Sequence, residues 1–262
     1  MAPQNWTIRF KGYLPVDDRM DERLRRVVAE IGSLPESAFE IDEEAGLITV
    51  DYTQVKGYLE ASRQALRTVR VGERLVVKPP GEDYQPQEGD IVLDIDPGEA
   101  FGSGLHQSTC LCLQALEKRV KRGSAVVDFG CGSGILAIAA ARLGAGHVTA
   151  VEADSRAVEV ARANTARNNL EEVVDVRQGD NVEDLGPRVD LVVANIVAEI
   201  IIAHVESIAR LLNDGGTLIA SGMTRWDAPD VERRLPEAGF DVAENLVDGN
   251  WIAIVAVKRP SV

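Results

Sequence analysis

The sequence contains few of the residues that form disulfide bonds or metal sites. Of its 262 residues, three are cysteine and three are histidine. An odd set of three cysteines does not suggest a disulfide framework and fits a reducing compartment. Neither residue type shows the ligand spacing of a metal site, so no metal is expected.

Long apolar runs are also absent. No run approaches the ~20 residues that a helix needs to span a bilayer. The first residues, Met1 to Phe10, show neither the basic region nor the apolar region of a secretory signal. We therefore expect a cytoplasmic protein that does not contact a membrane. The sequence does not indicate an oligomeric state.

The sequence contains fewer basic residues than acidic ones. Lys and Arg total 28 against 42 Asp and Glu, which gives a formal net charge of −14. Nucleic-acid binding depends on Lys and Arg contacts to phosphates, so direct binding of nucleic acid is not expected. The field of an acidic protein would favour a basic protein as substrate, although the same charge can simply keep the chain soluble.

The sequence patterns divide the chain into three parts. Residues 1–55 predict a small α+β unit, with a strand at 6–10, a helix at 20–31 and short strands at 38–41 and 47–52. Residues 56–90 predict a linker, with a helix at 58–67 and one extended segment, Val69 to Val77, that ends before Pro79-Pro80-Gly81. Residues 91–262 predict the main domain.

In the main domain, strand and helix patterns alternate from Ser108 onward. The strands are continuous apolar runs, as expected where both faces of a sheet are covered. This alternation predicts a parallel sheet with right-handed crossovers, and Asp248-Gly249-Asn250 predicts a final antiparallel hairpin. The expected fold class is α/β, a doubly wound, mostly parallel seven-stranded sheet with a small N-terminal α+β domain. The predicted strands are 125–129, 147–152, 173–178, 189–194, 217–221, 240–247 and 251–257, and the predicted helices are 109–120, 135–143, 157–168 and 198–212.

A glycine loop follows the first of these strands. Asp128 ends the apolar run, and Gly130, Gly132 and Gly134 follow before the helix that starts at Ile135. Glycines let the backbone turn tightly and approach a ligand closely. The helix N-terminus behind the loop favours negative charge. The pattern predicts a ligand site at this turn.

The spacing of these glycines discriminates between ligands. A dinucleotide loop reads G-x-G-x-x-G, whereas this loop reads G-x-G-x-G with Asp128 two residues ahead. A diphosphate would be repelled by that carboxylate. S-adenosylmethionine carries a cationic amine that would be attracted, and its carboxylate can meet the loop amides. The loop therefore predicts S-adenosylmethionine as cofactor and disfavours a dinucleotide oxidoreductase.

Three polar residues follow the next strands. Glu152 ends the second strand, where an acid can accept both ribose hydroxyls of a nucleoside. Asp180 follows the third strand, where a group contacting adenine would lie, although an ordinary loop acid fits there too. Asn195 ends the fourth strand, where its amide can hold an amine or the methionine part of the cofactor. A helix-capping role is the alternative for Asn195.

Upstream, Asp96-Pro97-Gly98 leads through Phe101-Gly102 and Gly104 to His106 and Thr109. With the Asp128 to Leu136 loop and Ala194-Asn195-Ile196, this stretch resembles the methyltransferases of the large-subunit ribosomal protein L11. The resemblance covers roughly Val71 to the C-terminus. It implies a Rossmann-like class I methyltransferase fold.

By this resemblance, Thr109, Gly130, Glu152 and Asn195 contact S-adenosylmethionine, and the loop from Phe101 to His106 covers the cofactor. A helix-terminal His106 without a chemical role is the alternative for that residue. The implied substrate is a lysine or α-amine of a ribosomal protein. For transfer to such an amine, we expect the backbone and Asn195 to orient the neutral nitrogen while water takes the proton. The stretch between Tyr52 and the linker helix is shorter than is usual in this family. A different protein or a small molecule is therefore an alternative substrate, and a non-catalytic nucleoside-binding module is a further alternative.

Overall fold

The computed structural model describes residues 67–98, 100–102, 104–183 and 185–260. By its backbone contacts the chain divides into two units, 1–53 and 54–262, and all described residues belong to the second. The strands expected at 6–10, 38–41 and 47–52 and the helices expected at 20–31 and 58–67 lie outside the described residues, apart from Arg67, so they stay predictions. Arg67 is not helical. The boundaries at 55/56 and 90/91 also stay predictions.

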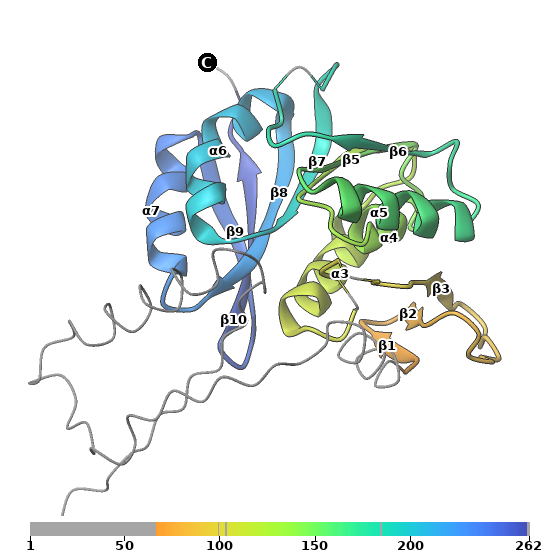
Figure 1. Cartoon of the computed structure of the whole chain (residues 1–262). Helices are drawn as coiled ribbons and strands as arrows, with labels where there is room; N and C mark the ends of the chain where they lie inside the picture. The colour runs from red at the N-terminus through yellow and green to blue at the C-terminus, as the bar shows by residue number, and fades with distance from the viewer. Residues whose placement is uncertain (1–66, 99, 103, 184, 261–262) are drawn as a thin grey trace, which may run out of the picture. The chain divides into compact units, whose positions relative to one another are not determined.

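The described unit is built around a seven-stranded sheet with the order β6-β5-β4-β7-β8-β10-β9 (Figure 1). All neighbours from β6 to β8 are parallel, and β10 is antiparallel to both β8 and β9. This confirms the doubly wound, mostly parallel sheet with a final hairpin. Its strands are β4 (Ala125–Phe129), β5 (His147–Glu152), β6 (Val174–Gln178), β7 (Val189–Asn195), β8 (Leu212–Thr224), β9 (Phe240–Asp248) and β10 (Trp251–Lys258).

Helices cover both faces of this sheet, so adjacent strand residues face different cores. Val126 packs in one apolar cluster and Val127 in the other. The first cluster contains α3 (Gln107–Arg119), α4 (Ile135–Arg142) and α5 (Ser155–Arg167), and the second contains α6 (Ala198–Leu211) and α7 (Ala228–Glu237). Burying each Leu or Ile side chain contributes about 1.5–3 kcal/mol. Burial on both sides explains the consecutive apolar residues of the central strands β4, β5 and β7.

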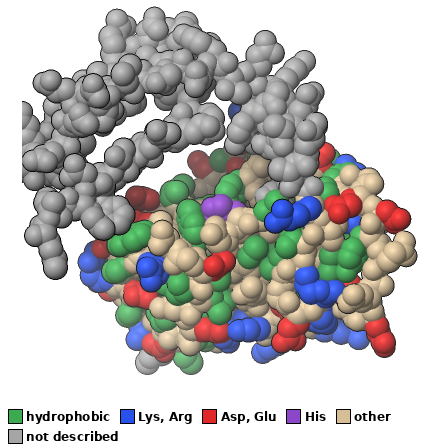
Figure 2. All heavy atoms as spheres, turned by 90° about the horizontal axis from the view of Figure 1, so that it is seen from below, with side chains coloured by type: hydrophobic (Ala, Val, Ile, Leu, Met, Phe, Trp, Pro, Cys, Tyr) green, Lys and Arg blue, Asp and Glu red, His purple; other side chains and the backbone are tan. Residues whose placement is uncertain are grey.

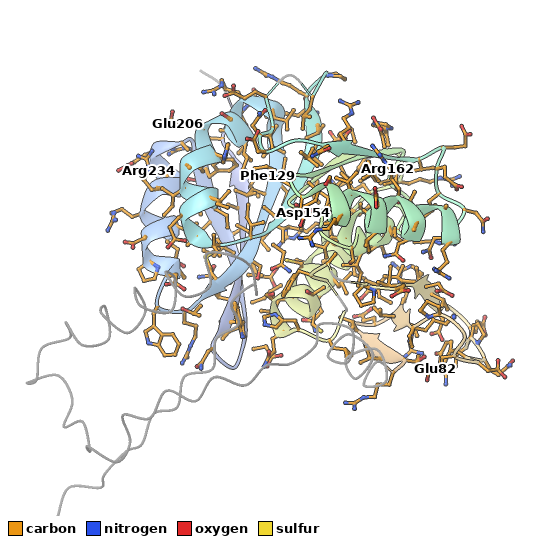
Figure 3. The ribbon with its side chains drawn as sticks, viewed as in Figure 1. Glu82, Phe129, Asp154, Arg162, Glu206 and Arg234 are labelled. Carbon is orange, nitrogen blue, oxygen red and sulfur yellow. The ribbon has the colours of Figure 1, made fainter. Side chains whose placement is uncertain are left out.

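Helix α7 was not predicted from the sequence. It carries Pro236 near its end and shows only a narrow apolar face, with Ala228, Val231 and Leu235 buried. An exposed ion pair at 3.3 Å joins Arg234 to Glu206 on α6 (Figure 3). Because such pairs contribute less than about 1 kcal/mol, the apolar contacts hold α7 in place.

A small second sheet precedes the main one. It has the order β1-β2-β3, with strands β1 (Val69–Val71), β2 (Leu75–Lys78) and β3 (Ile91–Asp94). The prediction of one extended segment from Val69 to Val77 was wrong: the chain reverses at Gly72, where φ is +70°, and β1 pairs antiparallel with β2. β2 then pairs in parallel with β3, which the sequence did not predict.

Among the described residues, no helix combines the length and apolar character that crossing a membrane requires. Those same residues contain no group of three or more His, Cys, Asp or Glu side chains arranged to hold a metal ion.

Candidate active site

The glycine loop connects β4 to α4 in a conformation that needs glycine. Gly130, Gly132 and Gly134 have φ values of +75°, +53° and +81°, in the left-handed region that residues with a Cβ rarely adopt. A Cβ on Gly132 would lie 2.6 Å from the carbonyl oxygen of Phe101. Gly134 is the N-cap of α4 and provides no side-chain acceptor for the first turn. The loop therefore presents the positive end of a helix to the carboxyl edge of the sheet.

Asp128 lies buried beneath this loop. One carboxylate oxygen accepts a hydrogen bond of 2.9 Å from the Ala137 amide in α4, and the other has no partner among the described residues. Burial raises the pKa of Asp128 to about 7, and the negative charge of Glu152 acts in the same direction. The Ala137 hydrogen bond opposes the rise. The site thus contains a carboxyl group that titrates near neutral pH and has a free acceptor atom.

Glu152 bridges two turns at the end of β5. One of its carboxylate oxygens accepts a hydrogen bond from the Gly132 amide at 2.9 Å. The other accepts from the amide of Asp154 at 3.0 Å, at the start of α5 (Figure 3). A carboxylate offers about four acceptor positions, so these two contacts leave room for two hydroxyl donors. This geometry suits a ribose.

Asp180 lies in the loop after β6, beside the same edge. The Gly179 amide donates to the Glu152 carbonyl oxygen at 2.9 Å, which brings the loop alongside β5. The Asp180 side chain is exposed and accepts a hydrogen bond of 3.0 Å from the Asn181 amide group. A contact from Asp180 to a ligand base stays a prediction.

Asn195 and Thr109 meet, although 86 residues separate them. The Asn195 Nδ2 donates to the Thr109 Oγ1 at 3.2 Å, from the end of β7 to the first turns of α3. Thr109 is fully buried, and the Asn195 Oδ1 is buried without a hydrogen-bond partner among the described residues. A buried acceptor without a donor is costly, which makes this atom a candidate contact for an incoming N–H group.

The segment before α3 contacts the glycine loop directly. The Ser133 amide donates to the Phe101 carbonyl oxygen at 2.8 Å, and the Ser133 hydroxyl donates to the Gly102 carbonyl oxygen at 2.7 Å. The Phe101 ring is 55 % exposed above this contact. This agrees with a loop that covers the ligand site, while the contact of Phe101 with a cofactor stays a prediction.

His106 caps α3 and packs between two aromatic rings. Its Nδ1 accepts a hydrogen bond from the Ser108 amide at 3.3 Å. Its ring centroid lies 5.3 Å from that of Phe101 and 4.4 Å from that of Trp251, both in edge-on geometry. Burial lowers the pKa of His106, because it disfavours the charged ring. The helix-capping role considered for His106 is present together with the aromatic contacts.

Sequence reasoning missed several residues that shape this site. Ser133 holds the covering segment, the residues from Phe101 to His106, through Phe101 and Gly102. Trp251 packs on His106, and Gly222 in β8 lies directly against the backbone of Ile196. A Cβ on Gly222 would lie 2.5 Å from the Ile196 nitrogen. For Gly222, the sequence signal was a glycine directly after a predicted strand, which often marks a close approach of another backbone segment. The contacts of Ser133 and Trp251 cross between segments far apart in the sequence and left no local pattern.

Comparisons with known proteins match almost the whole chain to one family. The family model described as ribosomal protein L11 methyltransferase (PrmA) matches residues 4–259. The chain is 42 % identical to the ribosomal protein L11 methyltransferase of Pelotomaculum thermopropionicum over 97 % of its own length and 84 % of the relative. It is 40 % identical to that of Heliobacterium modesticaldum, over 95 % and 78 % of the two chains.

Solved structures show the same relationship. A crystal structure of ribosomal protein L11 methylase from Lactobacillus delbrueckii subsp. bulgaricus matches with a TM-score of 0.67 and 32 % identity, over 74 % of this chain and all of that one. The T. thermophilus 16S rRNA N2 G1207 methyltransferase, in complex with AdoMet and guanosine, matches with a TM-score of 0.52 and 26 % identity, over 62 % and 46 % of the two chains. With a family model matched from residue 4 to residue 259 and relatives above 30 % identity over most of both chains, this chain belongs to the ribosomal protein L11 methyltransferase family.

Proposed function

We propose that this protein transfers methyl groups from S-adenosylmethionine to amino groups of ribosomal protein L11 in the cytoplasm. The family supports the reaction class and the acceptor protein. The observation that carries the choice of an amine is the Asn195 carboxamide, whose Oδ1 is buried. Its Nδ2 is anchored on Thr109, and its Oδ1 has no partner among the described residues.

The charges and hydrogen-bonding groups of the site suit S-adenosylmethionine. Glu152 has acceptor positions left for the ribose hydroxyls, and the N-terminal end of α4 suits the methionine carboxylate. The unpaired oxygen of Asp128 supplies negative potential for the cationic amino group. Thr109 and the glycine loop would line the same ligand, Phe101 and His106 would cover it, and Asp180 would approach the adenine.

The residues of this chain would act mainly by positioning the acceptor. S-adenosylmethionine, when bound, supplies a methyl group already activated by its sulfonium, so alignment of the attacking nitrogen provides much of the rate. A lysine amine must first lose a proton, which costs about 4–5 kcal/mol near neutral pH. Burial near the site lowers that cost. We infer that the Asn195 Oδ1 accepts an N–H of the neutral amine and thereby directs its lone pair, while water takes the released proton.

The surface around the site supports a protein as acceptor. The structure exposes seven large apolar side chains among its described residues, and five of them lie on segments next to the site. Exposed apolar and aromatic side chains, tryptophan among them, are enriched at protein-binding surfaces. One face of the molecule shows apolar side chains between acidic and basic ones (Figure 2). The five residues are Phe101 and Leu105 before α3, Val197 and Ile200 after β7, and Trp226 after β8.

The net charge supports a basic acceptor. The chain carries a formal charge of −14, so its field attracts a positively charged protein and repels nucleic-acid phosphates. We therefore propose that the protein acts on the free ribosomal protein without binding nucleic acid directly.

Intact-mass spectrometry of purified ribosomal protein L11 tests the proposal. The acceptor is incubated with this protein and S-adenosylmethionine, and its mass should rise in steps of one methyl group. Fragmentation should place the methyl groups on lysine or α-amine nitrogens. The Gly132→Arg variant, which fills the space beside Phe101, should give no mass gain.

Other outcomes would redirect the proposal. If S-adenosylmethionine binds by calorimetry but the acceptor mass does not change, the substrate is another protein or a small molecule. Binding without turnover of any amine would favour a nucleoside-binding module. Methyl groups found on oxygen or carbon atoms would contradict the role given to Asn195.

A further inference from the structure

Two asparagines, one on α5 and one at its C-cap, are buried although an asparagine on the surface of a helix is usually exposed. Asn164 and Asn168 are 1 % and 2 % exposed, and they lie four residues apart on one face of the helix. Burying a carboxamide without partners is costly, so each must be compensated by hydrogen bonds. Both find their partners in residues 94–96, at the end of β3 and directly after it.

The two side chains bind that segment as a neighbouring strand would. The Asn168 Oδ1 accepts from the Asp94 amide at 3.1 Å, and its Nδ2 donates to the Asp94 carbonyl oxygen at 2.8 Å. The Asn164 Oδ1 accepts from the Asp96 amide at 3.0 Å, and its Nδ2 donates to the Asp96 carbonyl oxygen at 2.8 Å. Between them, the Ile95 amide donates to the Lys78 carbonyl oxygen in β2 at 2.9 Å. Alternate residues thus bond to opposite sides, as in a sheet.

Asn164 makes one contact that Asn168 does not make. Its Nδ2 also donates to the Ser133 carbonyl oxygen at 2.9 Å, inside the glycine loop. The corresponding second contact of Asn168 goes back to α5, to the Asn164 carbonyl oxygen. Asn164 is therefore bonded at once to the glycine loop and to the segment that leads into the covering loop.

Ser133 extends this connection. Its amide and hydroxyl hold the carbonyl oxygens of Phe101 and Gly102, while its own carbonyl oxygen is held by Asn164. The chain is consequently held at Asp96 by Asn164 and at Gly102 by Ser133 of the glycine loop. Asn164 and Ser133 are themselves hydrogen-bonded to each other. Gly98, between Asp96 and Gly102, packs so close to α5 that a Cβ would lie 3.2 Å from the Val160 Cγ2.

We propose that Asn164 is a positioning residue for the cofactor: it sets the glycine loop and the covering loop against each other, so that both can contact S-adenosylmethionine together. Asn168 fastens the same segment but does not set the cofactor site. This assignment rests on the proposed function. It gives the small sheet β1-β2-β3 a part in cofactor binding, because the segment that Asn164 holds continues directly from β3 (Figure 1).

Asn164→Asp and Asn168→Asp form a matched pair that tests the assignment. Each change keeps the size of the side chain and the acceptor oxygen but replaces two donated hydrogen bonds by carboxylate–carbonyl repulsion. Both variants should lower the melting temperature by similar amounts. Titration calorimetry should show the dissociation constant for S-adenosylmethionine raised about tenfold or more in Asn164→Asp, and less than about threefold in Asn168→Asp, since one lost buried hydrogen bond corresponds to about a factor of ten.

The results separate the assignment from the proposed function. Equal dissociation constants in the two variants would overturn the assignment of Asn164, while S-adenosylmethionine binding by the unsubstituted protein would leave the proposed function standing. Failure of the unsubstituted protein to bind S-adenosylmethionine would overturn both. If a buried carboxylate prevents folding, Asn164→Ala and Asn168→Ala provide the second matched pair, with the same expected difference.

Discussion

Asn195 is the residue whose surroundings most restrict its role. One end of its carboxamide is bonded to a buried threonine, and the other end is a buried acceptor with no partner among the described residues. A residue that only capped the helix after β7 would direct its oxygen to amides of that helix. The N-cap of α6 is instead Val197, which has no side-chain hydrogen bond. The capping alternative for Asn195 therefore finds no support in these contacts.

Asn195→Ala should lower kcat for methyl transfer by about 100-fold, because an acceptor amine misplaced by about 1 Å loses that much rate. The dissociation constant for S-adenosylmethionine should change by less than about threefold. Single-turnover kinetics and calorimetry measure the two quantities. Thr109→Ser, which keeps the hydroxyl that anchors Asn195, is the control and should retain most activity. Full turnover by Asn195→Ala would exclude the orienting role.

Because of Asp128, the free energy of unfolding is expected to depend on pH. Burial raises its pKa to about 7 in the folded protein, whereas an unfolded aspartate titrates near ~3.9. The folded state therefore binds the proton more tightly, and the contribution of Asp128 to stability is largest at low pH. That contribution is lost as the pH rises toward 7, by about 1.4 kcal/mol for each pH unit.

Urea unfolding of the wild type and Asp128→Asn, in the absence of S-adenosylmethionine, tests this dependence. The substitution removes the titration and keeps the shape of the side chain. Relative to the variant, the wild type should lose about 2–3 kcal/mol of unfolding free energy between pH 5 and pH 7, and little more by pH 8. A difference that stays constant over this range would show that Asp128 is not protonated near neutrality in the folded protein.

At the scale of elements, the turn between β4 and α4 depends on how closely the covering segment approaches it. Gly132→Ala would place a Cβ 2.6 Å from the Phe101 carbonyl oxygen and push that segment away. The dissociation constant for S-adenosylmethionine should rise about tenfold, which corresponds to the loss of about 1.4 kcal/mol of binding free energy.

Gly81→Ala is the matched control for this change. Gly81 has a φ of +79° but nothing within 4 Å of an added Cβ, so the substitution adds backbone strain without a clash. Both variants should lose about 1–2 kcal/mol of stability from the left-handed conformation. Only Gly132→Ala should weaken binding, as measured by calorimetry. Equal affinities of the two variants for S-adenosylmethionine would contradict the inference that the covering segment must lie against the glycine loop.

At the scale of the whole molecule, the exposed apolar side chains next to the site predict how the acceptor docks. Trp226 is 68 % exposed in the turn between β8 and α7, and contact residues of this type often dominate binding energies. Trp226→Ala should raise KM for ribosomal protein L11 about tenfold while leaving the dissociation constant for S-adenosylmethionine unchanged. Steady-state methylation assays measure this separation.

Val242→Ala provides the comparison for that prediction. Val242 is also exposed, at 41 %, but it lies near the start of β9, the edge strand of the sheet, away from the segments around the site. Its KM for the acceptor should stay unchanged. Similar KM values for Trp226→Ala and Val242→Ala would place acceptor docking elsewhere on the protein.

The sequence by itself determined the seven-stranded sheet and the position of the glycine loop. Strands buried on both faces must be apolar throughout, and the loop between β4 and α4 must bend through left-handed angles, so local patterns record both. The sequence also predicted that Glu152 and Asn195 lie at one edge of the sheet. They end β5 and β7, and the carboxyl ends of parallel strands lie at the same edge. The sequence pattern did not reveal the chain reversal at Gly72 or helix α7. A single glycine within an apolar run and a narrow apolar face are weak local signals.

Only the tertiary structure decided which of these residues touch. The bond from Asn195 to Thr109 spans 86 residues, that from Asn164 to Asp96 spans 68, and that from Asn168 to Asp94 at the end of β3 spans 74. A sequence pattern shows that a residue is buried but not which polar group compensates its burial, since that depends on how distant elements pack. Asn164 and Asn168 read as ordinary helix residues until α5 is placed against β3 and the glycine loop.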